Sequence, residues 1–259
     1  MPYLMPKLFI KAKENIKEIV YCTDASEFYT KSLECSLREA LSSLRSTNNE
    51  GELDVAIQQL EQLSGNLYTI LNNNVREVSE GWGVLCHGDL WINNLMFKYD
   101  NAQVKSVKLI DLQTVRYSSP VIDILHFIYS STEKDLRDNH LDQLLEDYSI
   151  SLLIHLGKII RSTETMIHLE NRFSLENIRK QFRKHILYGL GVSMWLLPAV
   201  TFHPDKIPDL DSVQLSDFSN STQEKAMTLM QTPEYHSRMK HLILEFQSKG
   251  YLQDVKKFL

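Results

Sequence analysis

The feature that most constrains this chain is the segment over residues 84–123, in which acidic and amide side chains stand at fixed spacing. A His-Gly-Asp triplet ends at Asp89, and Asn94 follows five residues later. An apolar strand pattern over residues 107–110 then leads directly to a second aspartate, Asp111. An aspartate, an asparagine five residues later and an aspartate after the next strand are the layout of a kinase catalytic loop and its metal-binding turn.

The residue types in this pattern suit phosphoryl transfer. That reaction needs a group that accepts the proton of the attacking hydroxyl, and oxygen ligands that hold Mg²⁺ against the nucleotide phosphates. Asp89 suits the first role because it follows Gly88, whose missing side chain permits a tight turn and the close approach of a substrate. Asn94 and Asp111 supply the hard oxygen ligands that Mg²⁺ prefers. The alternative is a surface loop in which the aspartates only cap turns.

Composition and charge exclude several classes of function. The chain has 259 residues, 43% of them hydrophobic and 24% charged, which is enough for one large domain or two small ones with a sizeable core. A net charge of −5 provides no overall basic field for nucleic acid or an anionic membrane. The three cysteines, Cys22, Cys35 and Cys86, include no CxxC pair, which argues against a disulfide framework and a zinc site.

No segment of the sequence has the character of a membrane span or a signal peptide. The longest apolar stretch, residues 186–200, is short and is interrupted by two glycines and Pro198. Lysines and Pro6 break the apolar run at the N-terminus. We therefore expect a cytoplasmic protein that binds neither nucleic acid nor membrane, and the sequence carries no prediction of its oligomeric state.

Periodicity predicts an α+β protein that is mostly helical, with one small β hairpin in the middle. The expected helices cover residues 26–45, 52–78, 120–130, 133–157, 174–197, 217–230 and 234–248. Residues 84–86 are expected to form a short strand, and residues 94–97 to pair with 104–110 across a turn-forming stretch. The chain from Asp111 to Pro120 is expected to be irregular, and a loop is expected to begin at Pro198.

Three runs of sequence resemble one known family. They are HGDLWINNLMF over residues 87–97, IDLQ over 110–113 and SPVIDI over 119–124. Together they resemble the ecdysteroid kinase-like family, which belongs with choline and aminoglycoside kinases in the protein-kinase-like superfamily. The resemblance is sharp over residues 84–130 and looser elsewhere. It implies ATP- and Mg²⁺-dependent transfer of phosphate to a hydroxyl of a small molecule, with steroids as one substrate class.

The resemblance also implies roles for individual residues. Asp89 corresponds to the catalytic aspartate, and Asn94 and Asp111 correspond to the metal ligands that hold the nucleotide. His87 is expected to pack beneath the loop as structural support. Asp123 resembles the buried aspartate that braces the catalytic loop in this family, and the alternative is an ordinary carboxylate in the first turn of a helix.

The substrate side is less well defined by the sequence. Trp91 and Asn93 are candidates to line it, although Trp91 is equally suited to the core. The other histidines, including His126, His203 and His236, show no metal-ligand spacing and are expected to be surface or satisfied core residues. The helical region beyond residue 130 is expected to form the acceptor pocket or, as the alternative, plain core, and its candidate apolar residues are Phe182, Tyr188, Met194, Trp195 and Phe202.

A complete superfamily member also has an N-terminal lobe with a glycine-rich loop and a lysine–glutamate pair. Here no glycine precedes Gly51, and the residues before the catalytic segment have helical periodicity. We therefore expect residues 1–259 to form a single kinase-like C-terminal lobe without the nucleotide lobe. In this lobe residues 1–83 are a helical lead-in, 84–130 the catalytic and metal-binding core, and 131–259 a helical substrate-side subdomain.

Three functions remain open at this point. The chain is a fragment or truncated form of an active small-molecule kinase, or it is a catalytically inactive protein that binds an apolar ligand or a protein partner. The third and weakest alternative is a helical scaffold with vestigial motifs.

Overall fold

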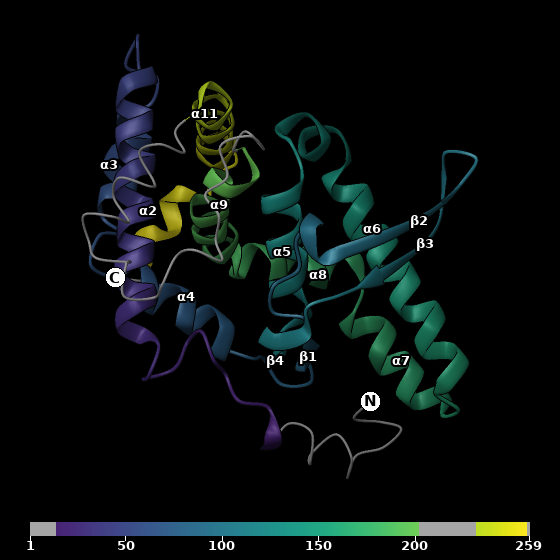
Figure 1. Cartoon of the computed structure of the whole chain (residues 1–259). Coiled ribbons are helices and arrows are strands. Elements are labelled where there is room, and N and C mark those ends of the chain that lie inside the picture. The colour runs from purple at the N-terminus through teal and green to yellow at the C-terminus, as the bar shows by residue number, and fades with distance from the viewer. Residues whose placement is uncertain (1–13, 202–231, 258–259) are drawn as a thin grey trace.

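The structure is a computed structural model that describes residues 14–201 and 232–257, and it confirms an α+β chain that is mostly helical (Figure 1). The expected helix over residues 217–230, together with Phe202 and His203, lies outside the described residues. The helices are α2 (Ser26–Thr47), α3 (Asp54–Glu61), α4 (Leu67–Arg76), α5 (Pro120–Ser131), α6 (Lys134–Ile159), α7 (Thr163–Arg172), α8 (Leu175–Lys184), α9 (Ile186–Val200) and α11 (Pro233–Ser248).

Four short strands form two separate antiparallel pairs in the middle of the sequence. The strands are β1 (Val84–Cys86), β2 (Leu95–Asp100), β3 (Gln103–Leu109) and β4 (Arg116–Ser118). Single 3₁₀ turns precede β2 and β4, and a third 3₁₀ segment, Leu252–Lys257, follows α11. Among the described residues, no helix combines the length and the apolar character that crossing a membrane requires.

The β2–β3 hairpin has the expected position, and its backbone explains the turn. Asn101 and Ala102 both have positive φ angles, of 46° and 64°, between the paired residues Asp100 and Gln103. Two central residues with positive φ match the right-handed twist of the flanking strands, so the hairpin closes tightly. It stands out from the helices beyond α6 (Figure 1), and all residues of β3 are exposed.

Several helix boundaries differ from the sequence prediction. The expected helix over residues 52–78 is two helices, because Gly65 takes a left-handed backbone with φ of 77° between α3 and α4. The expected helix over residues 174–197 is also two, separated at His185, and α9 continues through Pro198 to Val200 instead of ending in a loop there. The sequence prediction had also omitted α7, whose first turn is capped by the Ser162 side chain.

The segment between Asp111 and Pro120 was expected to be irregular, and this prediction was wrong. Residues 116–118 form β4, which pairs antiparallel with β1, so that Cys86 lies opposite Arg116. A strand of three residues is too short to show the alternation on which strand prediction depends. The pairing places the chain after Asp111 directly beside β1, which leads into the loop of His87, Gly88 and Asp89.

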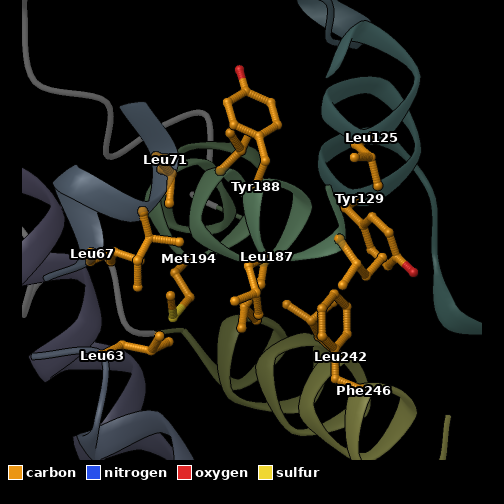
Figure 2. Close-up of a cluster of buried hydrophobic side chains, with 14 of the residues drawn as sticks. Leu63, Leu67, Leu71, Leu125, Tyr129, Leu187, Tyr188, Met194, Leu242 and Phe246 are labelled. Carbon is orange, nitrogen blue, oxygen red and sulfur yellow. The ribbon is translucent and has the colours of Figure 1, made fainter. Parts of the chain in front are cut away.

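Helix α9 lies at the centre of the hydrophobic core, and α2, α4, α5 and α11 pack around it. Figure 2 shows side chains of α4, α5 and α11, among them Leu67, Leu125 and Phe246, meeting at α9. Two glycines permit this close packing: a Cβ at Gly189 would lie 2.7 Å from the Tyr129 ring, and one at Gly191 would lie 2.6 Å from Leu71. The glycines that interrupt this apolar stretch therefore allow α5 and α4 to approach the central helix.

Candidate active site

The catalytic segment turns sharply immediately after β1. Gly88 has a φ of 85°, which L side chains rarely adopt. A Cβ at this position would lie 2.0 Å from the backbone oxygen of Thr114, far inside van der Waals contact. The loop before Asp89 therefore passes so close to the chain before β4 that only glycine fits.

Helix α5 holds the backbone of this turn through Asp123. One oxygen of the Asp123 carboxylate accepts a hydrogen bond from the His87 N–H at 2.6 Å, and the other accepts one from the Gly88 N–H at 2.9 Å. Burial raises the pKa of Asp123, and these two hydrogen bonds oppose the rise. By accepting hydrogen bonds from two consecutive backbone N–H groups, the Asp123 carboxylate restrains the loop, as expected of a brace.

His87 connects the catalytic loop to the turn that carries Asp111. Its side chain is buried, and Nε2 lies 2.8 Å from the backbone oxygen of Ile110, the residue before Asp111. The Thr114 hydroxyl donates to the backbone oxygen of His87 at 3.2 Å. Hydrogen bonds at the side chain and at the backbone oxygen of His87 therefore connect the loop to the turn.

Asp89 and Asn94 are in direct contact. The Asn94 side-chain amide donates to the backbone oxygen of Asp89 at 2.8 Å and to its carboxylate Oδ2 at 3.0 Å. Burial raises the pKa of Asp89, the Asn94 hydrogen bond lowers it, and the charge of Asp111 raises it. Asp89 is therefore an oriented carboxylate of increased basicity, and its side chain is 25% exposed.

Asp111 adopts an unusual backbone at the end of β3. Its φ of 60° and ψ of 64° lie in the left-handed region, where aspartate is among the better tolerated residues. The Ile110 N–H donates to the backbone oxygen of Asn94 at 3.1 Å, so the two ends of the hairpin meet. The side chain of Asp111 is exposed and accepts a hydrogen bond from the Gln113 amide at 3.3 Å.

The side chains at this end of the hairpin offer the oxygen ligands that Mg²⁺ prefers. The Asn94 amide nitrogen is engaged by Asp89, which leaves its Oδ1 as the atom available to a cation. Asp111 adds a carboxylate, and Mg²⁺ takes only one or two protein carboxylates beside phosphate and water. Within residues 14–201 and 232–257, no group of three His, Cys, Asp or Glu side chains could hold a metal ion.

A cavity of about 180 Å³ opens beside Asp89. Two larger cavities do not include Asp89: one of about 310 Å³ lies between α6 and α11, and one of about 350 Å³ is lined by Leu90 and Asp123 among others. Four of the twelve residues that line the cavity beside Asp89 are tyrosine or tryptophan, and Arg116 and His126 are its buried basic residues. It is lined by Val20, Tyr21, Tyr29, Gly88, Asp89, Gln113, Thr114, Arg116, His126, Tyr188, Val192 and Trp195.

The cavity draws on more of the chain than the sequence suggested. Tyr188 and Trp195, two of the predicted pocket residues, line it, whereas Phe182 and Met194 are core residues outside its lining. Figure 2 shows the Tyr188 ring pointing away from Leu187, its neighbour on α9. Two further aromatic side chains, from residues 21 and 29, come from the lead-in, which had been given no role in the site.

Trp91 and Asn93 do not line this cavity. Trp91 is partly buried against the hydrophobic core, and its side chain lies close enough to the Asp89 carboxylate for its indole N–H to lower the pKa of that group. Asn93 is exposed on the 3₁₀ turn before β2. Neither residue is part of the cavity lining, but the Trp91 side chain interacts with the Asp89 carboxylate.

Sequence reasoning also missed His126, which contacts Asp89 directly. It was expected to be a surface or satisfied core residue, but its Nε2 lies 3.4 Å from the Asp89 carboxylate Oδ1. A signal for this position existed in the sequence, because His126 follows Asp123 by three residues on α5. Residues three apart share one face of a helix, so a helix that braces the loop with Asp123 also directs His126 toward it.

Comparison with known proteins agrees with the geometry. A model of the ecdysteroid kinase-like family matches residues 1–160, which include the lead-in, the catalytic segment and α5. Neither the search of curated proteins nor the search of solved structures found a match. The family match extends over more than half of the sequence and contains Asp89, Asn94 and Asp111. The chain therefore belongs to the ecdysteroid kinase-like family.

Proposed function

We propose that this protein transfers phosphate from ATP to a hydroxyl group of a small molecule in a Mg²⁺-dependent reaction. Membership of the family supports a kinase-like phosphotransferase that acts on small molecules. The observation that carries the proposal is the carboxylate of Asp89, which is oriented by Asn94 and faces a cavity. In this proposal residues 1–259 act as a kinase-like C-terminal lobe in the cytoplasm, where ATP and Mg²⁺ are available.

Asp89 is the group that accepts the proton of the attacking hydroxyl. Its carboxylate lies in the wall of the cavity, and burial makes it a stronger base than an exposed aspartate. Asn94 holds one carboxylate oxygen, so the other is directed toward the acceptor. A general base must lie within hydrogen-bond reach of the proton it removes, and an alcohol in the cavity meets this condition.

Asn94 and Asp111 would hold the metal at the end of the hairpin. When bound, Mg²⁺ neutralises charge on the nucleotide phosphates and aligns them for transfer. The two residues are joined through the Ile110–Asn94 backbone hydrogen bond, which fixes their relative position.

The cavity suits the reacting end of an apolar alcohol. Tyr29, Tyr188 and Trp195 give it aromatic walls. Its volume of about 180 Å³ is below the roughly 300–1,000 Å³ of pockets that enclose a whole drug-sized ligand. A small alcohol, or one ring of a larger steroid-like acceptor, is therefore the substrate class that we propose.

Thermal unfolding with Mg²⁺ and ATP tests the nucleotide part of this proposal. A ligand that binds only the folded state raises the melting temperature once its concentration exceeds its Kd. We expect Mg²⁺ and ATP together to raise the Tm of the wild-type chain, and Asp111→Ala to remove most of this increase. Asp100→Ala is the matched control, because Asp100 lies at the opposite end of β2 and is exposed.

Turnover of ATP distinguishes the enzyme from a binding protein. Asp89→Asn should retain the Tm increase and lower kcat by about 10²- to 10⁴-fold, the range that a general base contributes. No Tm increase in the wild type would show that the proposal is wrong. A Tm increase without any ATP turnover would instead favour the inactive binding protein.

A further inference from the structure

His126 lies between the catalytic aspartate and the central helix. Its imidazole is 2% exposed, and Nε2 is 3.4 Å from Asp89 Oδ1. This nitrogen has no hydrogen-bond partner among the described residues. The separation exceeds the usual 2.7–3.2 Å of an N–H···O hydrogen bond, and contacts of catalytic groups often tighten only when substrate is bound.

The second ring nitrogen of His126 determines where its proton lies. Nδ1 is 3.5 Å from the hydroxyl of Tyr188 on α9. Burial lowers the pKa of His126 to about 3, helped by the nearby charges of Arg116 and His87, so the ring is neutral at pH 7. A neutral imidazole has one N–H. If the Tyr188 hydroxyl donates to Nδ1, that N–H is on Nε2 and faces Asp89.

A hydrogen-bond donor at His126 Nε2 would give each oxygen of the Asp89 carboxylate a side-chain partner. Asn94 already donates to Oδ2 at 3.0 Å, so His126 would fix the oxygen that Asn94 leaves free. Each carboxylate oxygen has further acceptor capacity, and that capacity remains directed to the cavity. An uncharged donor orients the carboxylate with less loss of basicity than a cation would cause.

We propose that His126 is a positioning residue, whose Nε2–H donates to Asp89 Oδ1 and directs this carboxylate at the acceptor hydroxyl. Tyr188 keeps the imidazole in the required tautomer. The proposal rests on the phosphotransferase function proposed above. It gives a chemical role to a buried polar contact that links α5, α9 and the catalytic loop.

The kinetic test uses ATP and Mg²⁺ alone, with water as the acceptor. In this reaction the γ-phosphoryl group passes to the water oxygen, the bond to ADP breaks, and the water proton passes to Asp89. We expect His126→Leu to lower kcat by about 10- to 100-fold, since misplacement of a reacting group by 1 Å costs about 10²-fold. The KM for ATP should stay within about twofold, because His126 does not contact the proposed metal ligands.

Two further variants separate positioning from packing. His126→Gln retains an N–H donor near the position of Nε2, and it should recover most of the lost kcat. His185→Leu is the matched control, since His185 is 1% exposed, also packs beside α9 and lies outside the cavity lining. It should lower stability but leave kcat within about twofold of the wild type. Equal losses of kcat in His126→Leu and His185→Leu would overturn the positioning role.

A spectroscopic test follows the imidazole itself. In the wild type with ¹⁵N-labelled histidine, NMR at pH 7 should show His126 as the neutral tautomer with its proton on Nε2. Asp89→Asn should shift the Nε2 resonance, and Tyr188→Phe should increase the fraction of the other tautomer. A proton on Nδ1 in the wild type, or no change in either variant, would contradict the proposal.

Different results would contradict the phosphotransferase function and the positioning role of His126. If the wild type neither binds nor turns over ATP with Mg²⁺, the phosphotransferase function is wrong and the positioning role fails with it. If the wild type turns over ATP and His126→Leu retains its kcat, only the role of His126 is wrong. The NMR result decides whether the Asp89–His126 hydrogen bond exists in either case.

Discussion

The Asp123 carboxylate and the Gly88 backbone N–H are joined by a hydrogen bond of 2.9 Å, which ties the first turn of α5 to the residue before Asp89. The other oxygen of Asp123 accepts from the His87 N–H at 2.6 Å. Gly88 has a left-handed backbone that no helix or strand stabilises. The conformation of the loop that carries Asp89 is therefore held by a side chain 35 residues away in sequence.

We predict that Asp123→Asn destabilises the protein and distorts the catalytic loop. An asparagine has one acceptor oxygen in place of two, so either the His87 or the Gly88 N–H loses its partner. Leaving a buried donor unpaired costs about 1–3 kcal/mol. Chemical denaturation should show this loss in the free energy of unfolding. Asp142→Asn, at a position 75% exposed on α6, is the control and should change it by less than about 0.5 kcal/mol.

We predict that Gly88→Ala is more destabilising than Gly65→Ala, although both glycines have positive φ, of 85° and 77°. A left-handed backbone costs an L residue about 1–2 kcal/mol, and this cost applies to both variants. At Gly88 the new methyl group would also lie 2.0 Å from the Thr114 oxygen, whereas at Gly65 it meets nothing within 4 Å. Urea unfolding of both variants measures the difference, and equal losses would contradict the close approach at Gly88.

We predict that His185 makes stability fall as the pH falls. Burial lowers its pKa to about 4, and the Lys184 charge adds to this effect while Glu77 opposes it. The unfolded chain has an ordinary histidine pKa of about 6.5. Between pH 6.5 and 4 the unfolded state therefore binds more protons than the folded state. The free energy of unfolding then decreases by up to about 1.4 kcal/mol per pH unit, and the contribution is constant below pH 4.

Comparison with His185→Gln isolates this contribution. Asp89 and Asp123 have raised pKa values, which give the opposite slope because the folded state retains their protons to higher pH. Both aspartates are present in the variant, so their contribution cancels in the difference. The free energy of unfolding of the wild type, minus that of His185→Gln, should decrease between pH 6.5 and 4. A difference independent of pH would mean that His185 is not buried in its neutral form.

The spacing of residues in the sequence was sufficient to predict the local parts of the site. The hairpin that joins Asn94 to Asp111 formed where strand and turn residues indicated, and α5 begins at Pro120 as expected. These features depend on neighbours within a few residues, through turn preferences and the fixed φ of proline. The family that the motifs resembled is confirmed by the match over residues 1–160.

Helix boundaries were less predictable, because apolar periodicity continues across short interruptions. The run over residues 52–78 retains helical spacing on both sides of Gly65, but the left-handed glycine separates α3 from α4. The pairing of β1 with β4 was missed for a related reason, since three residues contain too little pattern to indicate a strand. The break at Gly65 is a local backbone conformation, whereas the β1–β4 pairing joins segments about 30 residues apart in sequence.

What the sequence alone determined is the identity and order of the chemical groups: Asp89, Asn94 and Asp111 at kinase-like spacing. What only the tertiary structure decided is which distant groups meet them. Asp123 contacts the loop backbone, His126 faces the Asp89 carboxylate, and aromatic side chains from both the lead-in and α9 line one cavity. The physical reason is that local spacing encodes local geometry, whereas these contacts arise when helices pack around α9.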